Sequence, residues 1–291
     1  MNQADTLEKI MDTASAPHKT GQATQSPRVI SITSGKGGVG KSNLTTNLGY
    51  LLAKQGKRVL ILDADINLAN VDVLLGLTPE FNLHHVLMGE KTLDDVIIEG
   101  PGGIQILPGS SGIMELATLS ESQKMYFLAE MENVGKRIDV LLIDTAAGIN
   151  ENVIYFNLAA QERIVILTPE PTALTDAYAL IKVLSARHDV KRFKIVINIA
   201  QSEKDALAVY RQLSLVCDQF LGTLSLDFLG YIPYDKNLIK AVRSQRLVAE
   251  RFTDTAAAQH IGEISRQLLD IVPERTSDGN IKFFWQHIFE Q

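Results

Sequence analysis

The residues most capable of chemistry are those at 35–42, which read Gly-Lys-Gly-Gly-Val-Gly-Lys-Ser. They satisfy the phosphate-loop pattern GxxxxGK[ST], in which glycines let backbone N–H groups surround a polyphosphate. A lysine then meets the β- and γ-phosphates and a hydroxyl ligates Mg²⁺, roles that fall here to Lys41 and Ser42. We therefore predict a nucleoside triphosphate site built on Gly35, Lys36, Gly37, Gly38, Val39, Gly40, Lys41, Ser42 and Asn43.

Carboxylates follow two apolar runs. Residues 60–65 read Leu-Ile-Leu-Asp-Ala-Asp, and residues 138–144 end in Asp144 after an apolar stretch. Behind a phosphate loop, Asp144 is suited to holding Mg²⁺ through water, and Gly148 to a close approach to the γ-phosphate. Asp65 is suited to orienting the attacking water, and Asp63 to lying near the Mg²⁺ shell. The alternative that this acidic pair caps the next helix stays open.

The elements that must position these groups alternate between strand and helix. Strands are predicted at 28–33, 58–63, 104–108, 139–144, 163–168, 194–199 and 228–232. The first strand feeds the glycine loop, and a helix over 43–54 directs its N-terminus at the phosphates. Strands that are apolar on both faces favour an α/β fold with a mainly parallel, doubly wound sheet flanked by helices, whose ligands bind at the carboxyl ends of the strands.

The composition of the chain limits the possible domain organisation and classes of function. A chain of 291 residues, 45% of them hydrophobic, suits one α/β domain, which we place at 28–272 between terminal segments 1–27 and 273–291. The net charge of −6 gives no global attraction to DNA, so we expect no direct DNA binding. Cys217 is the one cysteine, which excludes a CxxC iron–sulfur carrier and favours a reducing, cytoplasmic setting. No secretion signal and no apolar run of about 20 residues is present.

The loop has a second lysine, Lys36, directly after its first glycine. With Ser34 before it, the loop resembles the deviant phosphate loop of the MinD/ParA family of P-loop ATPases, of the SIMIBI type. In that family the early lysine reaches across a nucleotide sandwich to the partner's ATP, much as an arginine finger acts in trans. The resemblance implies ATP/ADP and Mg²⁺ as cofactors, a homodimer in the ATP state, and Lys36, Lys41 and Asp65 as the catalytic residues.

Two stretches, 63–77 and 170–184, look like the flagellar-number branch of this family, FlhG or FleN. One departure is Asn67, which stands where the family usually has glycine. The resemblance implies control of flagellar number and placement through an FlhF-type GTPase, the flagellar switch (C-ring) proteins and antiactivation of the σ54-type regulator FleQ/FlrA. A MinD that selects the cell-division site and a ParA-type DNA partition ATPase remain alternatives.

Recognition of the base is also inferred by resemblance. Asn198 ends a strand at a position similar to the family's adenine-reading asparagine, and Pro233 and Tyr234 resemble the loop that covers the ring. An amide offers both a donor and an acceptor, which suits the adenine edge and favours ATP over GTP. A strand-terminal asparagine that only makes a turn is the alternative.

Both termini hold amphipathic segments. Near the C-terminus an apolar stripe at helical spacing consists of Ile281, Phe284, Trp285, Ile288 and Phe289. MinD-family members that visit the membrane use such a tail, so we expect reversible, peripheral binding to the inner face of the cytoplasmic membrane, with another protein or a groove on the core as alternative partner surfaces. The N-terminal stripe around Leu7 and Ile10 resembles the segment by which FlhG proteins stimulate FlhF, with Asn2 and Glu8 as departures. A frayed terminus is the alternative reading.

Overall fold

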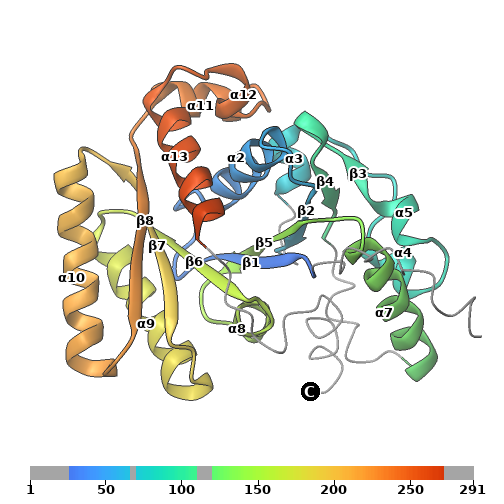
Figure 1. Cartoon of the computed structure of the whole chain (residues 1–291), viewed down its shortest axis with the longest axis horizontal. Coiled ribbons are helices and arrows are strands. Elements are labelled where there is room, and N and C mark those ends of the chain that lie inside the picture. The colour runs from blue at the N-terminus through green and yellow to red at the C-terminus, as the bar shows by residue number, and fades with distance from the viewer. Residues whose placement is uncertain (1–25, 66–69, 110–119, 272–291) are drawn as a thin grey trace, which may run out of the picture.

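The structure is a computed structural model that describes residues 26–65, 70–109 and 120–271. An eight-stranded sheet runs through it in the order β3-β4-β2-β5-β1-β6-β7-β8 (Figure 1). Every neighbouring pair is parallel except β3 and β4, which are antiparallel. The two amphipathic terminal segments lie outside the described residues, and so does Asn67.

The strands are β1 (Arg28–Ser34), β2 (Val59–Ala64), β3 (Ile98–Glu99), β4 (Gln105–Leu107), β5 (Val140–Ala147), β6 (Glu162–Leu167), β7 (Arg192–Ala200) and β8 (Ser225–Pro233). The helices are α2 (Lys41–Lys54), α3 (Val71–Leu75), α4 (Leu83–Leu87), α5 (Leu93–Val96), the 3₁₀ turn η1 (Pro101–Gly103), α7 (Glu121–Gly135), α8 (Glu151–Ala159), α9 (Pro171–His188), α10 (Glu203–Leu221), α11 (Lys236–Arg243), α12 (Val248–Arg251) and α13 (Ala256–Asp270).

The seven predicted strands are confirmed, with each end within three residues of its expected place. Every residue of β1 and β2 is buried, as expected for a parallel sheet covered on both faces. Strand β3 was missed because two residues cannot establish a periodic pattern, and the neighbouring β4 alone pairs with it.

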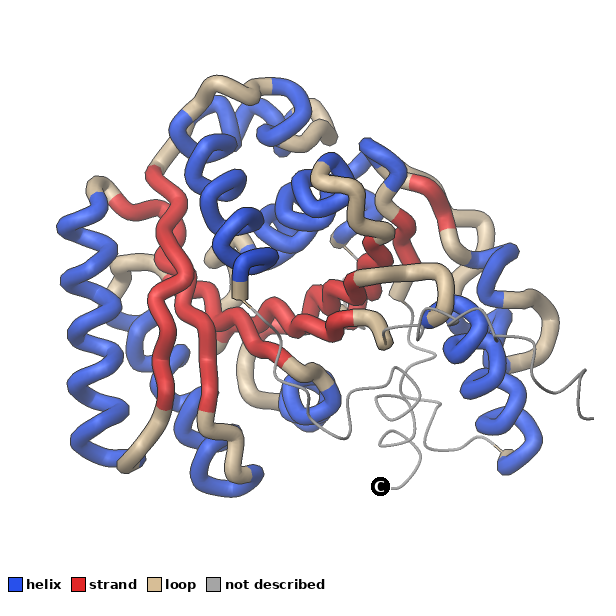
Figure 2. Tube along the Cα trace, in the orientation of Figure 1, coloured by secondary structure: helices blue, strands red, loops and turns tan. Residues whose placement is uncertain are grey.

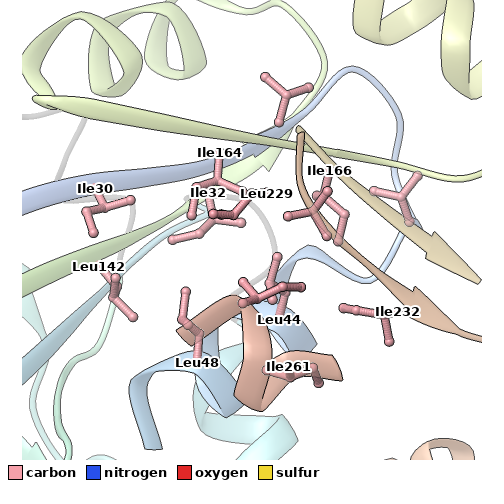
Figure 3. Packing of buried hydrophobic residues seen from close by; sticks show 14 of the residues in the cluster. Ile30, Ile32, Leu44, Leu48, Leu142, Ile164, Ile166, Leu229, Ile232 and Ile261 are labelled. Atoms are coloured by element: carbon pink, nitrogen blue, oxygen red, sulfur yellow. The ribbon is translucent and has the colours of Figure 1, made fainter. Parts of the chain in front are cut away.

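Two layers of helices cover the sheet (Figure 2). On one face Leu44 and Leu48 of α2 and Ile261 of α13 pack against strand residues that include Ile32 and Leu142 (Figure 3). On the other face Phe127 of α7 is buried among residues of β2 and β5, while α8, α9 and α10 continue that layer along β1, β6 and β7. No helix in the described part of the chain is both long and apolar enough to span a bilayer.

The strand order reverses at β1. The chain passes from β1 across β5 to β2, and its second half adds β6, β7 and β8 on the other side of β1. In open parallel sheets such a switch point leaves a crevice beyond the carboxyl ends of the strands, where ligands bind. The loop at 35–40 connects β1 to α2 at this point.

Candidate nucleotide site

The loop at 35–40 requires glycine at specific positions. Gly40 has φ 94° at the start of α2, a left-handed conformation that residues with a Cβ rarely adopt. A Cβ at Gly35 would lie 2.2 Å from the carbonyl oxygen of Asp176 in α9. The loop thus packs against α9 on one side. On its other side it leads into the N-terminus of α2, where backbone N–H groups favour an anion.

Lys41 and Asp144 form the buried centre of the site. The Nζ of Lys41 lies 3.8 Å from Oδ1 of Asp144, whose side chain is 0% exposed. Thr45 donates to the same Oδ1 at 3.2 Å. Burial raises the pKa of Asp144, and the charge of Lys41 with hydrogen bonds from Ser42 and Thr45 opposes that rise. Asp144 is therefore held within β5 by a cation and two hydroxyls.

One carboxylate oxygen of Asp144 has no hydrogen-bond partner among the described residues. This atom, Oδ2, is buried, and such an orphaned acceptor fits a water of a hydrated cation. The described residues contain no group of three or more His, Cys, Asp or Glu side chains that could hold a metal ion. Mg²⁺ in nucleotide sites uses one or two protein ligands together with phosphates and waters, so Ser42 and Asp144 suit it without a protein cage.

Asp63 lies beside Asp144, because the two residues are register partners in β2 and β5. Its Oδ2 accepts the N–H groups of Asn70 at 2.9 Å and Val71 at 3.1 Å, where α3 begins. Its Oδ1 accepts the N–H of Asp65 at 3.1 Å. These contacts correspond to the helix-capping alternative for the acidic pair, and a place for Asp63 in the Mg²⁺ shell stays a prediction.

The stability of the nucleotide-free protein should fall as pH rises because of Asp63. Burial, and then the charge of Asp144, raise the pKa of Asp63 from 3.8 to about 7. Between those values the native carboxyl keeps a proton that the unfolded chain has released, so the free energy of unfolding decreases by up to about 4 kcal/mol as pH rises from 4 to 7. Chemical denaturation from pH 5 to 8 measures this slope.

Asp63→Asn should remove most of that slope, because an amide does not titrate. Asp72→Asn is the matched control on the adjacent helix, where the carboxylate is half-exposed and accepts the N–H of Val73. Parallel pH profiles for wild type and Asp63→Asn would contradict the prediction.

Asp65 follows β2 and is half-buried. Its charge contributes to the raised pKa of Asp144, which places the two carboxylates close enough to interact. The middle of α3 is also held in place, because the side-chain amide of Gln245 donates to the carbonyl oxygen of Val73 at 2.8 Å. The structure thus brings Asp63, Asp65 and Asp144 together at the carboxyl edge of the sheet.

Lys36 makes its contacts away from Lys41. Its Nζ lies 2.6 Å from Oε2 of Glu170 and 3.0 Å from the hydroxyl of Thr172, both at the N-terminus of α9. The side chains of Lys36 and Glu170 are 37% and 62% exposed, so this ion pair lies at the surface. Sequence reasoning missed Glu170 and Thr172 as partners of Lys36, and Thr45 as a partner of Asp144, because no local pattern connects them.

Asn198 lies against the phosphate loop. Its Nδ2 donates to the carbonyl oxygen of Val39 at 2.7 Å, and its Oδ1 accepts the N–H of Ile199 at 2.9 Å. A Cβ at Gly40 would lie 2.3 Å from this Nδ2. Tyr234, exposed by 50%, follows Pro233 at the end of the neighbouring strand β8. The predicted base-reading residues therefore lie near the ends of β7 and β8, and their contact with adenine stays a prediction.

Gly148 lies on the opposite side of the loop. Its N–H donates to the carbonyl oxygen of Ser34 at 3.0 Å, which joins the end of β5 to the end of β1. Apart from its two chain neighbours, no described residue has a heavy atom within 4 Å of a Cβ built at Gly148. This open space suits the predicted approach of a terminal phosphate.

Comparison with known proteins agrees with this geometry. Residues 25–269 match the family model ParA, described as "NUBPL iron-transfer P-loop NTPase". The chain belongs to the ParA family of P-loop NTPases. A cysteine pair for iron is absent from its full sequence, whose one cysteine, Cys217, is buried.

Two curated relatives match almost the whole chain. Antiactivator FleN of Pseudomonas aeruginosa is 41% identical over 263 residues, which cover 90% of this chain and 94% of FleN. Flagellum site-determining protein YlxH of Helicobacter pylori is 34% identical, with coverage of 92% and 90%. Among solved structures, the MinC:MinD cell division protein complex of Aquifex aeolicus has a TM-score of 0.66 at 26% identity, with coverage of 86% and 99%. The expected MinD/ParA-type fold and family are therefore confirmed.

Proposed function

We propose that this protein is an ATPase that dimerises around two Mg·ATP, hydrolyses them slowly, and uses the ATP state to regulate flagellar number and placement. The observation that carries the proposal is that the two lysines of the loop have different surroundings. The side chain of Lys41 is 10% exposed and lies beside Asp144, whereas Lys36 is held at the surface by an exposed ion pair. A surface lysine beside the nucleotide site is available to a second copy of the chain.

Each residue has a defined task in this proposal. Loop N–H groups and Lys41 bind the phosphates, and Ser42 and Asp144 would hold Mg²⁺, which neutralises charge on the β- and γ-phosphates. Asp65 orients the attacking water, and the partner's Lys36 neutralises charge that develops on the γ-phosphate. Asp63 positions the backbone of Asp65 through its 3.1 Å hydrogen bond.

The flagellar role is supported by the names of the two relatives, an antiactivator and a flagellum site-determining protein. On this basis the proposed partners are an FlhF-type GTPase, the C-ring proteins and a FleQ/FlrA-type regulator. The likeness to the MinC:MinD complex keeps a division-site role as the second candidate. Pull-down of flagellar rather than division proteins by the ATP-bound form separates the two.

The terminal segments complete the proposal. We propose 28–272 as the ATPase domain and 281–291 as a segment that binds the membrane reversibly from the cytoplasmic side. One copy of the apolar stripe should bind weakly, because Lys282 is its one cation. Two copies in an ATP dimer gain from effective concentration, so recruitment would follow the nucleotide state.

The size of the protein in solution tests the proposal. With Mg·ADP, light scattering behind gel filtration should give the 32.0 kDa of one chain, and with Mg·ATP twice that mass. Hydrolysis of ATP measured in the same samples should rise more steeply than linearly with protein concentration, because the active form is a dimer. A protein that turns over ATP efficiently as a monomer would overturn the proposal.

A further inference from the structure

A stripe of positive charge lies on α11 and the turn that follows it. Lys236, Lys240 and Arg243 are spaced by four and three residues and so share one helix face, and all three are exposed. Arg246 in the turn and Arg251 at the end of α12 are exposed as well. We name these five residues the basic surface. In a chain of net charge −6, this concentration of cations is a local exception.

Three acidic side chains lie near the basic surface in the chain, and none of them pairs with it. Asp235 accepts the N–H groups of Asn237 at 2.8 Å and of Ala257 at 3.2 Å, and so caps α11 and joins it to α13. Glu250 of α12 has a buried Oε2, and its charge acts on Tyr50 of α2. Asp254, after α12, is exposed. Within the described part of the chain, no carboxylate forms an ion pair with any residue of the basic surface.

We propose that the basic surface binds the anionic headgroups of a membrane. The inference rests on the membrane recruitment proposed above and names the part of the folded domain that contributes to it. The C-terminal stripe supplies apolar side chains but only Lys282 as a cation. Stable attachment generally needs two signals, such as one apolar anchor and one polybasic patch. The basic surface supplies the second signal, with each cation near an anionic surface strengthening binding about five-fold.

The reach of the chain allows both signals to act on one membrane. The helices α11 and α12, which hold the basic surface, lie near the N-terminus of α13 (Figure 1). The described chain ends at Ile271, just after the C-terminus of α13. A helix of the 15 residues of α13 is about 22 Å long. The nine residues from 272 to 280 can extend about 30 Å. The apolar stripe can therefore return to the level of the basic surface.

Vesicle flotation of the full chain with Mg·ATP tests the inference. The test variant is Lys240→Gln/Arg243→Gln, which leaves Lys236 at the start of α11 unchanged. The matched control is Lys204→Gln/Arg211→Gln, which removes two exposed cations from one face of α10. The vesicles are phosphatidylcholine alone and phosphatidylcholine with about a third phosphatidylglycerol, each at low and physiological salt. Thermal unfolding and ATP-dependent dimerisation verify that both variants fold.

The wild type should prefer the anionic vesicles, and this preference should weaken with salt. The double variant of the basic surface should bind them about thirty-fold more weakly, while the α10 control binds as the wild type does. Equal binding by both variants would overturn the inference and leave membrane recruitment standing. A wild type that binds neither vesicle would overturn recruitment and the inference together. If the double variant of the basic surface lost salt-sensitive binding to random DNA and kept its binding to vesicles, the basic surface would be assigned to nucleic acid instead.

Discussion

Lys36→Gln is expected to abolish ATP-dependent dimers while the monomer still binds nucleotide. The Nζ of Lys36 contacts Glu170 and Thr172 in the single chain, and the buried lysine beside Asp144 is Lys41. Removing the charge at residue 36 therefore leaves the phosphate site of the monomer complete. Fluorescent-nucleotide titration and light scattering with Mg·ATP measure the two effects separately.

Turnover by Lys36→Gln should fall about 10³- to 10⁵-fold, the range by which a cation supplied in trans accelerates phosphoryl transfer. Glu170→Gln is the matched control, because it breaks the same ion pair and keeps Lys36. An exposed pair contributes about 0–1 kcal/mol, so this variant should change the ATP concentration needed for dimers by about five-fold at most. Normal dimers and turnover in Lys36→Gln would mean that Lys36 serves the monomer alone.

Asp65→Ala is expected to slow hydrolysis by about 10²- to 10⁴-fold, the usual contribution of a positioned general base. ATP dimers should accumulate, because assembly does not require the chemical step. The contacts that hold the site remain, since Asp63 bonds to the backbone N–H of residue 65 rather than to its side chain. Single-turnover release of phosphate, together with light scattering, measures both outcomes.

Asp72→Asn is the control for this variant as well, because it alters a carboxylate on α3 that contacts the N–H of Val73. It should hydrolyse ATP at a rate close to that of the wild type. If Asp65→Ala turned over ATP as fast as Asp72→Asn, orientation of the attacking water would have to be assigned to another group of the site.

Much of the fold was predictable because its signals are local. Each strand from β1 to β8, except β3, contains a short run rich in apolar residues, and burial on both faces of a parallel sheet selects such runs in the central strands. The phosphate loop was predictable for the same reason, because the glycines that shape its backbone and the lysine that follows them lie within a few consecutive residues. Asp144 could be predicted because it directly follows the four apolar residues 140–143.

Contacts between distant residues were decided only by tertiary structure. Lys36 and Glu170 are 134 residues apart, and Val39 and Asn198 are 159 apart, yet the strand order brings each pair to one edge of the sheet. The backbone N–H groups that engage Asp63 become available only where α3 begins.

The sequence by itself thus predicted a nucleotide site and placed a second lysine in its phosphate loop. Only the tertiary structure decided that this lysine is held at the surface by α9, and that Lys240 and Arg243 share an exposed face with no acidic partner among the described residues. The physical reason is that a motif specifies the conformation of adjacent residues, whereas the partners of a side chain depend on which elements the sheet places next to each other.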